Sequence, residues 1–350
     1  MSTPTGRFRV ALTGDFFGVD GVPRYPDLGL SVFEGHPRIE CVPFPCHRPR
    51  VESDQVADAQ GVIVLTPAVT AESVSVSRNL LAIGRFGVGY DAVDVGACTL
   101  ADVAVFITAG AVDRSVAEAT VGWMIALSHH MRIKDRLVRD GHWDERSKYM
   151  GRELRDRTFG AIGLGGIGRA TVELLRGFGM KPPLAFDPHL SAEDAARAGV
   201  TLVPLDDLLG AADFVSIHCP LTEQTRSLIG RRELALMKPD ACLINTARGG
   251  IVDEDALREA LEGRRIAGAA LDCFAVEPVT VPHRLAGLDN VLLAPHCIAW
   301  TEELFRDIGR AACGGMLDLS LGKRPRGVVN PEVFDRPGFL EKWARLTSST

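Results

Sequence analysis

The sequence predicts an α/β fold of two domains, each with a parallel β-sheet, and three observations lead to this prediction. Short apolar runs of the length of buried strands alternate with helical patterns along the 350 residues. One run near the middle of the chain is followed by a glycine-rich turn. Two series of strand–helix units lie before and after about residue 113, and a chain of this length can build two hydrophobic cores.

The first series covers residues 7–112. Five short apolar runs in it are interpreted as strands, and the intervals between them suit helices. The segment 18–35 is rich in glycine and proline and is expected to be mostly loop. The expected strands are residues 8–12, 39–43, 61–65, 81–86 and 103–107.

A helix is expected to join the two series. Ser115 and Glu118 have the spacing of a capping box, which predicts a helix that begins there and runs to about residue 131. The following segment, 132–157, is charged and contains Trp143 and Tyr149. This composition is typical of an arm that lies across another surface, such as that of a partner subunit.

The second series, residues 158–297, predicts a doubly wound nucleotide-binding domain. Its clearest helix covers residues 253–261, with Asp253 as the N-cap. The expected strands are residues 158–162, 184–187, 200–203, 213–217, 241–245, 267–271 and 291–294.

A last helix, at about residues 302–320, follows Thr301 as its N-cap. We expect this helix to return the chain to the first domain, which is then discontinuous. The first domain would comprise residues 1–112 completed by 301–350, and the second would comprise residues 113–300.

A dinucleotide site is predicted where the strand at 158–162 ends. Gly163, Gly165 and Gly168 have G-x-G-x-x-G spacing, which allows a tight turn, close approach of the backbone to a pyrophosphate and close helix packing. Asp187 ends the next strand, where a carboxylate would accept hydrogen bonds from an adenosine ribose and repel a 2′-phosphate. The alternative is a glycine-rich packing turn in an ordinary α/β domain.

Three polar residues each follow a later strand, where ligands of open α/β sheets bind. Arg248 offers a bidentate fork suited to a carboxylate, although it could instead form a surface ion pair with Asp253 or Glu254. His296 follows the last strand, and a lone histidine there is more often structural than catalytic. Together with Glu277, however, these residues fit one mechanism: the histidine supplies a proton, the glutamate holds its tautomer and raises its pKa, and the arginine orients a 2-oxo acid.

The composition disfavours several classes of partner and site. A net charge of −6 gives no basic excess for nucleic acid, and the run 323–326 is interpreted as a solvated loop. No apolar stretch has the length of a membrane span or of a signal-peptide core. Eight cysteines without a C-x-x-C pair indicate reduced thiols, a cytoplasmic protein and no metal site, and a nucleophilic role for Cys297 is the weaker alternative.

Several motifs, in order over roughly residues 80–300, resemble those of the D-isomer-specific 2-hydroxyacid dehydrogenases. That family includes D-lactate, D-glycerate, glyoxylate/hydroxypyruvate and 3-phosphoglycerate dehydrogenases. Beside the glycine turn, the matching motifs are residues 84–91, 115–118, 218–222, 245–250, 272–278 and 295–296.

The resemblance implies a Rossmann-like NAD-binding domain, a flavodoxin-like substrate domain and an active site in the cleft between them. It implies that Arg248, Glu277 and His296 form a catalytic triad and that Val88 and Gly89 present backbone N–H groups to the substrate carboxylate. The substrate would be a small 2-oxo or 2-hydroxy acid, and the protein a homodimer joined through the nucleotide domain. The cofactor would be NAD. Asp187 would bind the adenosine ribose, Gly166 and Ile167 the pyrophosphate, and Asp272 the carboxamide. The groove would be lined by Cys219, Pro220, Thr246 and Ala247, and the remaining cofactor-binding residues would be Gly163, Gly165, Gly168 and His296.

Departures from the family pattern limit what can be said of the substrate. Phe86 and Tyr90 stand where smaller side chains are common, so we expect Phe86 to contribute to an altered substrate pocket. The run 297–301 after the histidine is also bulkier than usual, and its Trp300 either shapes the pocket or packs between domains. No serine-sensing regulatory domain is expected after residue 320.

Two alternatives to a 2-hydroxyacid dehydrogenase stay open at this stage. One is a formate- or phosphite-type dehydrogenase on the same scaffold, although formate dehydrogenases pair the histidine with glutamine where this chain has Glu277. The other is an NAD-sensing, corepressor-like binding protein, which could retain the whole triad.

Overall fold

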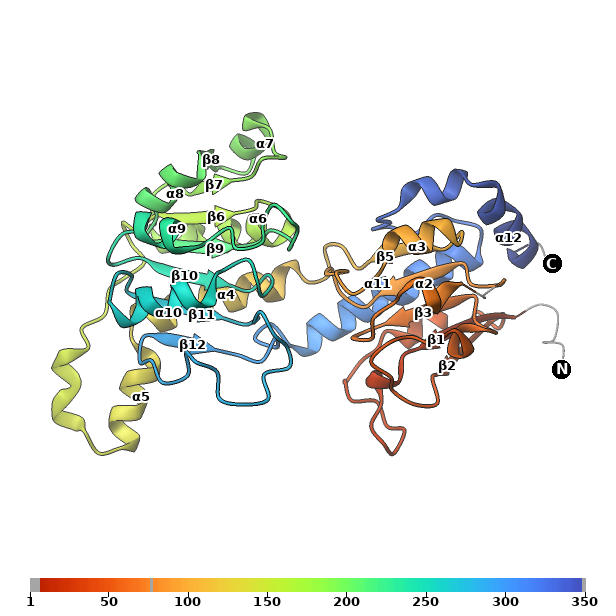
Figure 1. Cartoon of the computed structure of the whole chain (residues 1–350), viewed down its shortest axis with the longest axis horizontal. Helices are drawn as coiled ribbons and strands as arrows, with labels where there is room; N and C mark the ends of the chain where they lie inside the picture. The colour runs from red at the N-terminus through yellow and green to blue at the C-terminus, as the bar shows by residue number, and fades with distance from the viewer. Residues whose placement is uncertain (1–6, 76–77, 348–350) are drawn as a thin grey trace. The chain divides into compact units, whose positions relative to one another are not determined.

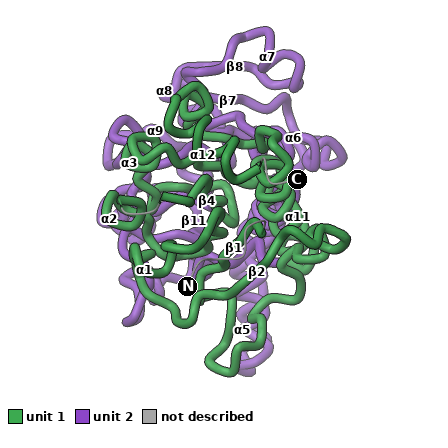
Figure 2. Tube along the Cα trace, turned by 90° about the vertical axis from the view of Figure 1, so that its right-hand side faces the viewer, with its two compact units in different colours: residues 1–112, 301–350 green, residues 113–300 purple. Residues whose placement is uncertain are grey.

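The computed structural model describes residues 7–75 and 78–347. The chain forms two compact units, one of residues 113–300 and one that combines residues 1–112 with 301–350 (Figure 2). Figure 1 labels the elements of each unit.

The unit 113–300 is built on a seven-stranded sheet in which every paired strand is parallel (Figure 1). The order is β12-β11-β10-β9-β6-β7-β8, so the chain starts in the centre, builds outward to β8, and returns to β9 beside β6. This is the Rossmann arrangement, and the direction of winding reverses between β6 and β9. The strands are β6 (Phe159–Ile162), β7 (Leu184–Phe186), β8 (Thr201–Leu202), β9 (Phe214–Ile217), β10 (Cys242–Asn245), β11 (Gly268–Leu271) and β12 (Val291–Leu293).

Helices cover both faces of this sheet, which explains why β6, β9, β10 and β11 are buried along their whole length. One core contains Leu208, Leu234 and Leu257 from α8, α9 and α10, and the other contains Met124 and Val172 from α4 and α6. The helices are α4 (Asp113–Ser128), α5 (Met131–Arg139), α6 (Gly166–Leu175), α7 (Ala192–Arg197), α8 (Leu205–Ala211), α9 (Arg231–Leu236) and α10 (Glu254–Glu262), with 3-10 turns at Trp143–Lys148 and Arg176–Phe178.

The other unit has a five-stranded parallel sheet in the order β2-β1-β3-β4-β5, which is the flavodoxin-like order (Figure 1). Helices α1, α2 and α3 contribute Val56, Val74 and Cys98 to the core on one face, while α11 packs against β3 and β4. The strands are β1 (Phe8–Leu12), β2 (Ile39–Pro43), β3 (Gly61–Val64), β4 (Ala82–Arg85) and β5 (Ala104–Ile107). The helices are α1 (Ser53–Val56), α2 (Ala71–Val74), α3 (Val95–Leu100), α11 (Glu302–Ser320) and α12 (Pro337–Thr347), with 3-10 turns at Gly14–Phe16, Leu30–Phe33 and Pro331–Asp335.

Two predicted helices begin at the expected caps. The Asp253 side chain accepts hydrogen bonds from the N–H groups of Asp255 and Ala256 at the start of α10. The Thr301 side chain accepts the N–H of Leu304 at the start of α11. Helix α11 is not the last helix, however, because α12 follows it, and its Lys342 ammonium binds the carbonyl oxygens of residues 80, 101 and 102.

The predicted capping box at Ser115 is wrong. Helix α4 begins at Asp113, so Ser115 lies inside its first turn and cannot be the N-cap. The helix also ends at Ser128 rather than near residue 131, because His130 has a positive φ of 51° that a right-handed helix cannot contain. A separate helix, α5, starts at Met131, so the expected arm begins as a helix.

Candidate active site

One edge of the seven-stranded sheet collects the candidate residues of the unit 113–300. Because the strands are parallel, the segments that follow them all emerge at the carboxyl edge of the sheet. The glycine turn follows β6 and Asp187 follows β7, while Cys219 and Pro220 follow β9. Thr246, Ala247 and Arg248 follow β10, Asp272 and Glu277 follow β11, and His296 follows β12.

The glycine turn is as compact as the spacing predicts. Gly163 has a positive φ of 91°, and a Cβ there would lie 2.9 Å from the backbone nitrogen of Cys219. A Cβ on Gly168 would lie 2.7 Å from the Gly163 carbonyl oxygen, so this residue brings α6 against the turn. Gly165, by contrast, is exposed with open space beside it. The turn therefore leaves the N-terminus of α6 accessible to an anion such as a pyrophosphate.

Asp187 is bound to the glycine turn. Its Oδ2 accepts the N–H of Leu164 at 2.9 Å, and its Oδ1 accepts the N–H of His189 at 2.9 Å. These bonds fix the carboxylate at the tip of β7, beside the turn. Since each carboxylate oxygen can accept more than one hydrogen bond, the group can still receive two ribose hydroxyls.

Asp113 lies at the same helix end, and the sequence reasoning missed it. A Cβ on Gly166 would overlap the Asp113 carboxylate, so the two residues are in direct proximity at the start of α6. Burial raises the pKa of Asp113. In the sequence, this residue appeared only as part of the segment before a helix, and no local signal connected it with a turn 50 positions later.

His296 and Glu277 form a hydrogen-bonded pair. The Nδ1 atom of His296 lies 2.8 Å from Oε2 of Glu277, whose Oε1 accepts the Phe274 N–H at 2.8 Å. Burial works to raise the pKa of Glu277, but the hydrogen bonds from His296 and Phe274 outweigh it and lower the pKa overall. The side chains are 46% and 36% exposed, respectively, so the pair is accessible to a ligand.

Asp272 holds the backbone next to His296. Its Oδ1 accepts the N–H groups of Cys297 at 2.9 Å and Ile298 at 3.1 Å. Burial raises the pKa of Asp272 to about 6, against the lowering effect of these two N–H groups. Burial also raises the pKa of the Cys297 thiol, which disfavours a nucleophilic role for that residue.

Arg248 lies in a turn that is fixed from two sides. The Asn245 amide donates to the Arg248 carbonyl at 2.8 Å and accepts the Ala247 N–H at 3.0 Å. A Cβ on Gly249 would overlap the Phe274 carbonyl, so this turn packs directly on the loop that leads to Glu277. The charge of Arg248 is one of the influences that lower the pKa of Glu277.

The two carboxylates that could have paired with Arg248 at the surface have other partners. Asp253 caps α10, and Glu254 binds the Ala275 N–H and His283.

Neutral side chains stand at the remaining groove positions. Burial raises the pKa of Cys219 to about 11, so its thiol is uncharged, and the Pro220 carbonyl accepts the Thr225 hydroxyl at 2.6 Å. The Thr246 hydroxyl lies 3.4 Å from that of Thr120 in α4.

The predicted substrate residues Phe86, Val88 and Gly89 belong to the other unit, where they follow β4. Phe86 is only 3% exposed, because its ring packs edge-on against Phe16 at 4.9 Å and near Phe305. Val88 and Gly89 are partly exposed.

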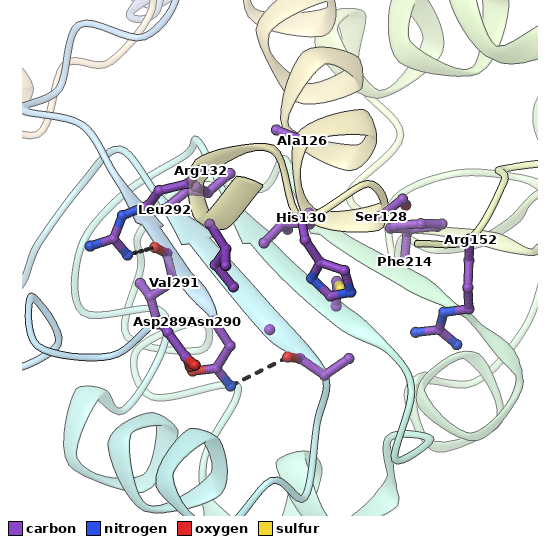
Figure 3. Close-up of a pocket in the computed structure, with 15 residues that line it drawn as sticks. Ala126, Ser128, His130, Arg132, Arg152, Phe214, Asp289, Asn290, Val291 and Leu292 are labelled. Carbon is purple, nitrogen blue, oxygen red and sulfur yellow. Dashed lines mark hydrogen bonds between the residues drawn. The ribbon is translucent and has the colours of Figure 1, made fainter. Parts of the chain in front are cut away.

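A small cavity lies at the opposite edge of the seven-stranded sheet (Figure 3). It has a volume of about 50 Å³ and is bordered by the first residues of β9 to β12, together with His130, Arg132 and Arg152. It is too small for a dinucleotide, and the length of the strands separates it from the candidate residues at the carboxyl edge.

In residues 7–75 and 78–347, no group of three metal-binding side chains is present. None of the helices in these ranges is long and apolar enough to cross a membrane.

Comparison with known proteins identifies a family to which part of the chain is similar. Residues 121–297 match the protein family described as "D-isomer specific 2-hydroxyacid dehydrogenase, NAD binding domain". The chain is 39% identical over 271 residues to a D-3-phosphoglycerate dehydrogenase of Archaeoglobus fulgidus, covering 77% of this chain and 51% of that protein. This chain therefore spans about half the length of such relatives.

Two further similarities extend over nearly whole chains. A glyoxylate reductase of Korarchaeum cryptofilum is 34% identical over 323 residues, which are 90% of this chain and 96% of that protein. The crystal structure of a glyoxylate reductase from Paecilomyes thermophila superimposes with a TM-score of 0.79 at 27% identity, over 94% of this chain and 99% of that one.

Proposed function

The chain belongs to the D-isomer-specific 2-hydroxyacid dehydrogenase family, and we propose that it transfers a hydride reversibly between NAD(H) and a small D-2-hydroxy acid/2-oxo acid pair. The observation that carries this proposal is the hydrogen bond between His296 and Glu277. His296 follows β12 and Glu277 follows β11, in the same sheet as β6, which leads into the glycine turn. The relatives reported above are named D-3-phosphoglycerate dehydrogenase and glyoxylate reductase, so neither a formate- or phosphite-type dehydrogenase nor a corepressor-like protein is favoured.

In this proposal, His296 exchanges the proton. An ionised Glu277 can only accept hydrogen bonds, so Nδ1 of His296 carries the proton shared between them, at 2.8 Å. The other ring nitrogen, Nε2, is then the atom that gives a proton to the substrate oxygen during reduction and takes it back during oxidation. Glu277 stabilises the positive imidazolium and fixes the ring orientation.

Arg248 is proposed to hold the substrate carboxylate through its bidentate guanidinium. The hydrogen bonds of Asn245 and the contact of Gly249 with the Phe274 carbonyl fix the turn that carries it. Val88 and Gly89 would add backbone N–H groups to the same carboxylate, and the buried ring of Phe86 would support their loop.

The NAD site is proposed at the glycine turn. When bound, the nicotinamide supplies or accepts the hydride, which is the chemistry that these side chains lack. Gly163, Gly165, Gly166, Ile167 and Gly168 would hold the pyrophosphate at the N-terminus of α6, and Asp187 the adenosine ribose. The groove beyond them would be lined by Cys219, Pro220, Thr246 and Ala247, and Asp272 would face the carboxamide.

We further propose a homodimer in the cytoplasm. Met131, Val138, Trp143 and Met150 are exposed apolar side chains in the segment that follows α4, and burying them against a second copy would remove them from water. All eight cysteines are free, which suits a reducing compartment. Sedimentation equilibrium of the wild type and of Trp143→Ala would test the dimer. A monomeric wild type would contradict it.

The decisive test of the function is turnover of a panel of 2-oxo acids. Purified protein is mixed with NADH or NADPH and with glyoxylate, hydroxypyruvate, pyruvate and larger 2-oxo acids, and absorbance at the nicotinamide band is followed. We expect turnover with at least one acid and a preference for NADH. Binding of NADH without turnover of any acid would contradict the enzymatic function.

A further inference from the structure

Glu277 lies on a loop that lacks regular structure. Residues 275–282 follow β11, form neither helix nor strand, and are exposed. A carboxylate that must orient an imidazole cannot move freely, because small displacements of catalytic groups are costly. Some contact must therefore fix this loop.

One carboxylate, that of Glu254, binds both ends of the loop. At the first end, Oε1 of Glu254 accepts the Ala275 N–H at 2.6 Å. At the second end, Oε2 of Glu254 lies 3.1 Å from Nε2 of His283. The Glu254 and His283 side chains are only 11% and 14% exposed, so the contact between these two side chains is partly shielded from water. Glu254 thus closes the loop 275–283 at its base.

His283 is held in the tautomer that this contact needs. Its Nδ1 accepts the Leu285 N–H at 3.4 Å, which leaves Nε2 to carry the hydrogen donated to Glu254. The imidazole also lies against the ring of Phe274, with the ring centres 4.8 Å apart. Phe274 and Leu285 are both buried, so the second end of the loop is anchored in the core.

The closed base is directly connected to the candidate catalytic groups. Phe274, which precedes Ala275, donates its N–H to Glu277, and Glu277 binds His296. The Phe274 carbonyl packs against Gly249, the residue after Arg248. Movement of residues 274 and 275 would therefore displace Glu277 and the turn of Arg248 together.

We propose that Glu254 and His283 form a clamp across the loop 275–283 and that this clamp positions Glu277 for proton exchange at His296. The second half of this statement rests on the proposed function. Glu254 and His283 are positioning residues, since each acts through the loop and not on substrate or cofactor.

A double-mutant cycle tests the positioning role. Glu254→Ala is made in the wild type and in Glu277→Gln, and kcat is measured per NADH-binding site with the best 2-oxo acid. We expect Glu254→Ala to lower kcat 10- to 100-fold in the wild type with the Kd for NADH changed less than twofold. In the Glu277→Gln background, Glu254→Ala should lower kcat by less than about twofold. Equal losses in both backgrounds, or unchanged kcat in the single variant, would overturn the proposal.

Two further variants separate positioning from general damage. Glu254→Gln keeps an oxygen that can accept the Ala275 N–H, but its amide nitrogen cannot accept the hydrogen on Nε2 of His283. It should therefore recover only part of the kcat lost in Glu254→Ala. Asp255→Ala is the matched control, because Asp255 lies on the same turn of α10 and pairs at the surface with Arg284 beside His283. It should leave kcat unchanged. Failure of the glutamine to rescue, or an equal loss in Asp255→Ala, would contradict a specific clamp.

Hydrogen–deuterium exchange tests the clamp without any turnover. In nucleotide-free protein, peptides covering residues 274–285 should exchange at least tenfold faster in Glu254→Ala than in the wild type or Asp255→Ala. Unchanged exchange would overturn the clamp itself. If the wild type reduces no 2-oxo acid, the proposed function fails, whereas the exchange result still decides whether Glu254 closes this loop.

Discussion

Both carboxylate oxygens of Glu277 are occupied, Oε2 by Nδ1 of His296 at 2.8 Å and Oε1 by the Phe274 N–H at 2.8 Å. The group that would orient the histidine is therefore itself oriented by the backbone. Asp272 adds a second constraint by binding the N–H groups of Cys297 and Ile298, directly after His296. One carboxylate therefore fixes the ring of His296, and another fixes the backbone directly after it.

Replacing His296 should abolish turnover without abolishing cofactor binding. A positioned general acid contributes typically about 10²- to 10⁴-fold, so we expect kcat of His296→Ala to fall by that factor. The Kd for NADH, measured by fluorescence titration, should change only a few-fold, because the glycine turn lies on other strands. A kcat within twofold of wild type would remove His296 from the mechanism.

Asp187 should determine the preference for NADH over NADPH. Its carboxylate would repel a 2′-phosphate, and Asp187→Asn removes the charge while keeping an oxygen for the Leu164 N–H. We expect the ratio of kcat/KM for NADH to that for NADPH to fall by roughly tenfold, which corresponds to about 1.4 kcal/mol. A wild type that prefers NADPH would contradict this assignment, as would an unchanged ratio.

The carboxylate of Asp113 should weaken cofactor binding in the wild type, so removing its charge should strengthen that binding. Its carboxylate lies against Gly166 at the N-terminus of α6, where we propose that the negatively charged pyrophosphate binds. Removing a like charge a few ångströms away is worth about 1 kcal/mol in a water-like dielectric, so Asp113→Asn should bind NADH roughly fivefold more tightly. The gain should shrink at high salt. Asp207→Asn, on the surface of α8, serves as the charge control and should leave the Kd unchanged.

The sequence patterns predicted the strands well because both sheets are covered on two faces. Each expected strand is present, with ends that differ by at most one residue, since runs such as Phe159–Ile162 are apolar throughout. The capping box failed because Ser115 and Glu118 have the right spacing but Ser115 lies three residues after the N-cap position of α4. Helix α12 was missed because its stability depends on contacts with distant residues, such as those of Lys342 with residues 80, 101 and 102.

Parallel topology explains why the candidate residues of one unit could be collected from the sequence. Residues that follow parallel strands lie at the same edge of the sheet, so Arg248, Glu277 and His296 could be grouped without knowledge of any contact between them. The contacts of Asp113 and Glu254 could not be predicted in this way. A carboxylate in the first turn of a helix is ordinary, and only the folded chain shows Asp113 against Gly166 and Glu254 between Ala275 and His283.

Asp272 should make stability depend on pH in the mildly acidic range. Burial raises the pKa of this carboxyl to about 6 in the folded protein, compared with about 3.9 in an unfolded chain. The folded protein therefore binds this proton more tightly. The resulting stabilisation is present in full below about pH 4 and is lost as the pH rises through about 6.

Asp272→Asn removes this titration while keeping an oxygen that can accept the Cys297 and Ile298 N–H groups. Between pH 5 and pH 8, the wild type should lose about 1.4 kcal/mol of unfolding free energy relative to the variant, because its carboxyl ionises while buried. The measurement is the Tm of both nucleotide-free proteins at pH 5, 6, 7 and 8. The Tm of the wild type minus that of the variant should fall steadily across this series. A constant difference would show that the Asp272 carboxyl does not titrate between pH 5 and pH 8, so that its pKa is not raised, and a rising difference would also contradict the prediction.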